Sequence, residues 1–148
     1  MEDYLLNHKW KIPGLFLLFT GIILTVVYFS SNPRLEAPVF AIFSSFMEVK
    51  TFEVFRTNIF EELLLLSLLS GLFLIAFSRE RIEKQEYISA RGKSLALAVI
   101  LNAILICLSI VFVFGSGFLG FTVLNIYLCL IFYIAIFNVL KYRINHSP

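Results

Sequence analysis

The chain has 148 residues, of which 59% are hydrophobic, 15% are charged and 17 are Phe, and its formal net charge is +2. With a mean hydropathy of +0.90, this composition lies far from that of a soluble domain and excludes that class. We therefore expect an integral membrane protein.

Four segments are apolar enough to cross a bilayer. A transmembrane helix needs about 20 mainly apolar residues, because hydrocarbon offers the backbone no water to bond. The spans are expected at residues 13–30, 59–77, 95–114 and 119–140. A β-barrel is disfavoured because these runs are continuously apolar and do not alternate. The sequence predicts an all-α membrane protein, a single four-helix transmembrane bundle over residues 1–148.

The loop between the first and second spans, residues 31–58, is rich in aromatic and apolar side chains. These are Phe40, Phe43, Phe46, Met47, Phe52 and Phe55. So many apolar groups are expected to lie in the membrane interface or across the outer mouth of the bundle. We expect a short interfacial helix or an extended turn here, with a ligand-binding lid as the alternative.

The second span opens with NIFEEL, which places two carboxylates in its first turn. Asn58 suits an N-cap, and Glu61 lies where the acid of a capping box lies. Both Glu61 and Glu62 are favoured by the positive end of the helix dipole. The alternative is that one of them faces the bundle interior and binds a cation or a proton.

Charge is concentrated in SRERIEKQEYISARGK, residues 78–93, where eight of sixteen residues are charged. Opposite charges four residues apart, Arg79/Glu83 and Glu80/Lys84, favour a helix. We therefore expect the second span to continue as a helix from Ile59 to about Ala90, extended into the cytoplasm. The segment is either an orientation anchor or a docking surface for a soluble partner or anionic lipid headgroups. The candidate docking residues are Arg79, Arg81, Glu83 and Glu86.

The third and fourth spans lie in a run from Ser94 to Leu140 that contains no Asp, Glu, Lys or Arg. These 47 residues are enough for two spans. The stretch GSGFLG, residues 115–120, supplies the turn between them, because its glycines permit a tight reversal.

Basic residues near span ends remain in the cytoplasm, so their distribution predicts the orientation. With four spans, both tails and the middle loop share one side, and that side carries nine basic residues. They are Lys9, Lys11, Arg79, Arg81, Lys84, Arg91, Lys93, Lys141 and Arg143. The other side carries Arg34, Lys50 and Arg56. Both termini are therefore expected in the cytoplasm.

A polar layer is expected inside the bundle. Asn102 lies about 10 Å from the cytoplasmic edge of the third span, at a depth shared by Thr20, Ser70 and Tyr133. An Asn side chain in lipid seeks a partner on a neighbouring helix, so we expect Asn102 to face inward and to bond Ser70, Thr20 or Tyr133. The layer is either a packing contact or a transport or binding site.

Motifs of enzymes are absent from the sequence: it has no CxxC, HExxH, GxSxG or phosphate-binding glycine loop. Its two histidines, His8 and His146, lie in the tails, and Cys107 and Cys129 lie within spans. We expect no catalytic activity, no cofactor and no metal. Direct binding of nucleic acid is not expected either, because the basic residues alternate with acids.

Three segments, LLNHKWKIPGLFLL, TNIFEELLLL and AFSRERIEKQEYISARGKSL, resemble an uncharacterised family of small bacterial inner-membrane proteins with four spans. In that family an Asn and an acidic pair open the second span, matched here by Asn58, Glu61 and Glu62. A motif of the form S-[KR]-E-[KR]-x-E-D-E-[FY]-I closes it. The matches to this motif are Ser78, Arg79, Glu80, Arg81, Glu83, Glu86, Tyr87 and Ile88, whereas Lys84 and Gln85 depart from its acidic run.

The resemblance implies a multi-pass protein of the bacterial inner membrane. Members of the family are encoded near small helix-turn-helix regulators, which points to signalling. We expect a non-enzymatic sensory, regulatory or partner-anchoring component. A transporter, channel or pore-forming oligomer is the alternative, and an intramembrane enzyme ranks third. The expected partners are the lipid bilayer, a cytoplasmic regulator and further copies of the chain.

Overall fold

The computed structural model describes residues 5–31, 33–44, 50–82 and 84–146. The chain is mostly helical. In chain order, the elements are a short 3-10 helix (His8–Trp10), α1 (Lys11–Ser31), β1 (Glu36–Ser44), β2 (Lys50–Asn58), α2 (Phe60–Phe77), α3 (Gln85–Phe112) and α4 (Ser116–His146). All four α-helices are long and apolar enough to cross a membrane, which confirms the predicted set of four and fits a multi-pass membrane protein.

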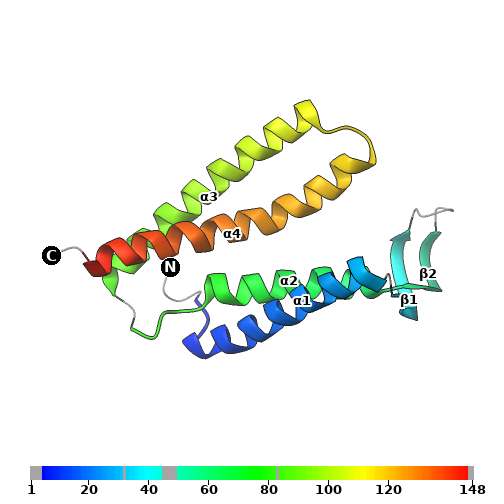
Figure 1. The fold of residues 1–148 in the computed structure, drawn as a ribbon, viewed down its shortest axis with the longest axis horizontal. Coiled ribbons are helices and arrows are strands. Elements are labelled where there is room, and N and C mark those ends of the chain that lie inside the picture. The colour runs from blue at the N-terminus through cyan, green and yellow to red at the C-terminus, as the bar shows by residue number, and fades with distance from the viewer. Residues whose placement is uncertain (1–4, 32, 45–49, 83, 147–148) are drawn as a thin grey trace.

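The helices form two antiparallel pairs, α1 with α2 and α3 with α4, joined mainly through α2 and α4 (Figure 1). The start of α1, the end of α4 and the connection between α2 and α3 lie at one end of the molecule, which we call the terminal end. The β-strands and the α3–α4 turn lie at the other end, the hairpin end. Most apolar side chains of the helices point outward, as expected where lipid replaces water.

Glycines bring α1 and α2 into close contact. A Cβ added to Gly71 would lie 2.6 Å from the backbone nitrogen of Leu18, and one added to Gly14 would lie 2.8 Å from Cβ of Leu74. Small residues permit such backbone approach between helices in lipid. Next to them, the buried Ser67 hydroxyl donates to the carbonyl oxygen of Leu17 at 2.9 Å.

The α3–α4 turn forms at the start of the predicted glycine stretch. Gly115 adopts a φ of 69°, a conformation that favours glycine. α4 already begins at Ser116, so Gly117 and Gly120 are helical. The prediction of a tight reversal is confirmed, but the turn is shorter than the stretch that suggested it.

The loop between α1 and α2 is a β-hairpin, so the expectation of a short helix here is wrong and the chain is not purely α-helical. β1 and β2 pair antiparallel, from Glu36 opposite Asn58 to Ser44 opposite Lys50. The aromatic and β-branched residues that suggested interfacial burial also favour a pleated strand. The predicted contacts of Phe46 and Met47 lie outside the described residues.

The predicted continuation of the second span into a cytoplasmic helix is also wrong. α2 ends at Phe77, Ser78 is extended, and none of residues 79–82 and 84 is helical. We call the connection between α2 and α3 the link. The helices that project at the terminal end are instead α3 and α4. The expected pair of Glu80 with Lys84 gives way to ion pairs of Glu80 with distant lysines, and the pair of Arg79 with Glu83 lies outside the described residues.

The buried core gathers near the terminal end. One cluster contains Ala76, Ala98 and Tyr133, and a second contains Tyr87, Ala90 and Phe137. These residues come from α2, α3 and α4, so packing fixes the link between α2 and α3 at the place where the charged side chains converge.

Candidate functional site

Glu80 joins three parts of the chain at the terminal end. Its carboxylate accepts a hydrogen bond from Nζ of Lys11, at the start of α1, at 2.5 Å, and lies 2.9 Å from Nζ of Lys141, near the end of α4. The Glu80 side chain is only 13% exposed. The link is thereby tied to the first and the last helix.

The two lysines decide the protonation state of Glu80. Burial raises the pKa of this carboxyl, but the hydrogen bonds and positive charges of Lys11 and Lys141 together outweigh burial and hold the pKa below its usual value. Glu80 is therefore ionised at neutral pH, and the three side chains carry a net positive charge.

Arg91 on α3 caps the end of α2. The residue is 3% exposed. Its guanidinium donates to the carbonyl oxygens of Ala76 at 3.4 Å and Ser78 at 3.1 Å, and to the Tyr133 hydroxyl at 3.3 Å. The last carbonyls of a helix lack intrahelical partners and form the negative end of its dipole, so a cation is favoured there. The guanidinium carbon also lies 4.4 Å from the centre of the Phe137 ring.

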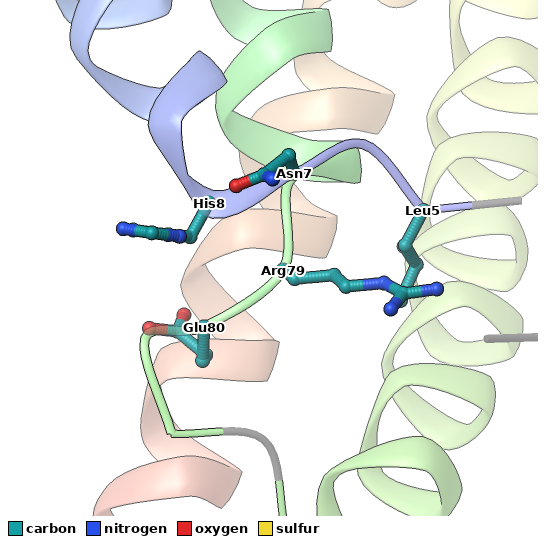
Figure 2. Close-up of a pocket in the computed structure, with 5 residues that line it drawn as sticks. All are labelled: Leu5, Asn7, His8, Arg79 and Glu80. Carbon is teal, nitrogen blue, oxygen red and sulfur yellow. The ribbon is translucent and has the colours of Figure 1, made fainter. Parts of the chain in front are cut away.

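The N-terminal segment pairs with the link like a short parallel strand. The backbone nitrogen of Leu6 donates to the Phe77 carbonyl oxygen at 2.9 Å, and that of Arg79 donates to the Leu6 carbonyl oxygen at 2.8 Å. A pocket of about 380 Å³ lies at this junction, lined by Leu5, Asn7, His8, Arg79 and Glu80. Figure 2 shows the Arg79 side chain extending toward Leu5, while His8 and Glu80 lie on the opposite side.

Beyond the link, α3 and α4 are held together by polar contacts. Oδ1 of Asn145 accepts from the Tyr87 hydroxyl at 2.8 Å and from Nζ of Lys84 at 2.9 Å. The Tyr87 ring packs edge-on against Phe137. The projecting ends of α3 and α4 are therefore one ordered unit.

The predicted docking residues differ in their exposure. Arg81 and Glu86 are exposed, and Arg79 is half-buried beside the N-terminal segment. Glu83 lies outside the described residues. The exposed side chains of the link include Ile82, which is 75% exposed and follows Arg81.

The predicted polar residues of the interior are not brought together. Ser70 donates to the Leu66 carbonyl oxygen and Thr20 to that of Phe16, each within its own helix. Tyr133 contacts Arg91 instead of Asn102. Oδ1 of Asn102 is buried and has no hydrogen-bond partner among the described residues, so it does not accept the expected bond from Ser70, Thr20 or Tyr133.

The acidic pair lies at the hairpin end, and both Glu61 and Glu62 are exposed. Glu61 accepts a hydrogen bond from the Tyr28 hydroxyl at 2.5 Å. Asn58 precedes the N-cap position, which Ile59 occupies. Oδ1 of Asn58 accepts from the backbone nitrogens of Leu35 and Phe60, at 2.9 and 3.2 Å, so this residue fastens the β-hairpin to α2.

The sequence pattern predicts Lys11, Lys141 and Arg91 only as part of the cytoplasmic excess of positive charge. Lys141 ends the run without charge and Arg91 shortly precedes it. A carboxylate at a membrane boundary requires a basic partner at the same depth. The matching depths of Glu80, Lys11 and Lys141 were therefore the signal in the sequence that could have predicted this contact.

Among the described residues, no group of three or more His, Cys, Asp or Glu side chains could hold a metal ion. Comparisons with protein-family models, with curated proteins and with solved structures give no match.

Proposed function

We propose that this chain is a non-enzymatic, multi-pass protein of the bacterial inner membrane that holds a soluble regulatory protein at the membrane surface. The terminal end faces the cytoplasm in this proposal. The nine basic residues on the side of the tails and the middle loop, against three on the other side, support that orientation.

The observation that carries the proposal is the charged link, which several contacts fasten to the helices. Glu80 ties it to α1 and α4, Arg91 ties it to α3, and Leu6 pairs with it along the backbone. A surface held this firmly loses little entropy when a partner binds. Arg81 and Ile82 remain exposed on it, and Glu86 is exposed in the first turn of α3. Together they offer both signs of charge and one apolar contact.

Pull-down from a cytoplasmic extract by the full-length, detergent-solubilised protein tests this proposal. Reversal of Arg81 to Glu together with Ile82→Asp should abolish capture of a specific partner, because both side chains are exposed and neither holds the fold. The control pair, Arg56→Glu with Val54→Asp, alters exposed residues of β2 and should leave capture intact. Equal capture by the wild type and the link variant would refute the docking surface.

Transport is the second candidate function, and two buried amides favour it. Oδ1 of Asn102 on α3 and Oδ1 of Asn125 on α4 are both buried without a hydrogen-bond partner among the described residues. Asn102 lies about 15 Å and Asn125 about 14 Å along their helices from the α3–α4 turn, so they share one level. A hydrogen-bond acceptor without a partner deep in a membrane costs free energy, and such acceptors mark sites where a polar ligand or a cation can bind.

Flux measurements in proteoliposomes test this candidate. If cations or protons pass between Asn102 and Asn125, the wild type should show flux and Asn125→Leu should abolish it. The control variant Asn138→Leu, which alters an exposed asparagine on the same helix, should preserve the flux. Wild-type vesicles with no flux above that of empty vesicles would exclude this route.

A further inference from the structure

We propose that the terminal end binds the phosphate headgroup of an anionic phospholipid in the pocket between the N-terminal segment and the link. The pocket is lined by Leu5, Asn7, His8, Arg79 and Glu80 and has a volume of about 380 Å³ (Figure 2). This volume falls within the range of small-molecule sites, about 300–1,000 Å³.

The charges at the terminal end, where the pocket lies, favour an anion. The one carboxylate in its lining, Glu80, is paired with both Lys11 and Lys141. The exposed basic residues at this end are Lys9, Arg81, Lys84, Lys93 and Arg143. Among the described residues, Glu86 is the exposed acid at the same end. Basic clusters at a membrane boundary attract anionic headgroups.

The hairpin end lacks this excess. Its exposed charged side chains, within the described ranges, are Arg34, Arg56, Glu36, Glu61 and Glu62. Acids are at least as frequent as bases in this set. An anionic lipid is therefore drawn to the terminal end of the molecule and not to both ends.

The position of the pocket suits a lipid better than a soluble anion. It lies where the apolar helices stop, because α1 begins at Lys11 and α2 ends at Phe77. Trp10, 49% exposed at the base of α1, occupies the level at which tryptophan is enriched in membrane proteins. Leu5 adds an apolar side chain to the lining.

An apolar groove on α1 can receive the acyl chain. The groove has a volume of about 470 Å³ and is lined by Ile12, Leu15, Phe16, Leu18, Phe19 and Ile22. It starts at Ile12, one helical turn after His8, so a headgroup at the base of α1 would place its chain beside this groove. A free phosphate would make no use of it.

Trp10 is the only tryptophan of the chain, which makes its fluorescence a local probe of the site. The full-length protein is reconstituted in phosphatidylcholine nanodiscs that contain a fixed fraction of brominated phosphatidylglycerol or, separately, brominated phosphatidylcholine. One basic residue near the surface enriches an anionic lipid about fivefold, so brominated phosphatidylglycerol should quench Trp10 as if its local concentration were several times higher.

Two variants locate the preference. In His8→Glu/Lys9→Glu, which alters exposed residues beside the pocket, the two brominated lipids should quench Trp10 equally. In Arg34→Glu/Arg56→Glu, at the hairpin end, the preference should equal that of the wild type. Equal quenching in the wild type, or an unchanged preference in the first variant, would overturn the pocket. Loss of the preference on adding inorganic phosphate at constant ionic strength would assign the site to free phosphate and overturn the lipid.

Discussion

The Arg91 guanidinium on α3 donates a hydrogen bond to the carbonyl oxygen of Ser78, 3.1 Å away, just beyond the end of α2. The Arg91 side chain thus supplies hydrogen-bond donors to carbonyl oxygens at the end of α2, where intrahelical donors are lacking. Because Tyr133 on α4 bonds the same guanidinium, the contact joins three helices.

Replacement of Arg91 by Met should destabilise the protein by about 2 kcal/mol, because the buried carbonyl oxygens of α2 lose their donors. Lys at this position should restore less than half of the loss, since it lacks the planar fork of the guanidinium. Unfolding in sodium dodecyl sulfate, followed by helicity, measures both variants. Arg143→Met, at an exposed position, serves as the control; an Arg91→Met protein as stable as this control would contradict the cap.

Replacement of Glu80 by Gln should lower stability at neutral pH by about 1–2 kcal/mol, because two lysines lose their charged acceptor. The folded-state pKa of Glu80 is depressed. Its contribution is therefore complete above the unfolded value, about 4.3, and is lost as the pH falls through the lower folded value.

The stability gap between the wild type and Glu80→Gln should accordingly persist above about pH 4.3 and close as the pH falls below this value. Thermal unfolding in detergent above and below this pH measures the gap. Glu86→Gln, an exposed carboxylate on α3, should show little gap at any pH. A Glu80→Gln gap that widened in acid would contradict the ion pairs.

Gly71→Ala should separate α1 from α2 and cost about 1–3 kcal/mol, the usual penalty for overpacking. The added Cβ would lie 2.6 Å from the backbone nitrogen of Leu18, which cannot rotate away. Gly120→Ala on α4, where nothing lies within 4 Å of the new atom, should be neutral or stabilising by up to about 1 kcal/mol. Denaturant unfolding of the Gly71→Ala and Gly120→Ala variants distinguishes the steric crowding of α1 against α2 from the mere loss of a glycine.

The proposed orientation predicts the location of reporter fusions. Fusions after Ala90 and at the carboxy terminus should both be active as cytoplasmic reporters, and a fusion at Ser44 should be active as an external one. The physical reason is the retention of Lys and Arg near span ends in the cytoplasm. An external reading after Ala90 would exclude the orientation.

The four long helices could be predicted from sequence because each depends on a local property, a long run without charge such as Ser94 to Leu140. The end of α2 could not. The pairs of Glu80 with Lys84 and of Arg79 with Glu83 favour a continuing helix by a few tenths of a kcal/mol each. Lys11 and Lys141, 69 and 61 residues from Glu80 in the sequence, offered it better-placed partners.

The candidate site was predictable in its residue types and not in its contacts. Arg81 and Glu86 lie on an exposed charged segment, as the composition of residues 78–93 indicated. The roles of Arg91 and of Asn58 depend on where other elements end or begin, because Ser78 follows the end of α2 and Leu35 precedes the start of β1. Such information is tertiary and is absent from any local pattern.

The glycine contact of α1 with α2 has a mechanical consequence. Two helices that touch backbone to backbone cannot slide past each other without crowding Leu18 and Gly71, so we expect them to move together as one rigid body. Asn58 fastens the β-hairpin to the start of α2. Glu80 lies just past the other end of this helix, which is about 27 Å long. We therefore expect that a displacement of the β-hairpin would tilt α1 and α2 together relative to α4 and strain the ion pair of Glu80 with Lys141.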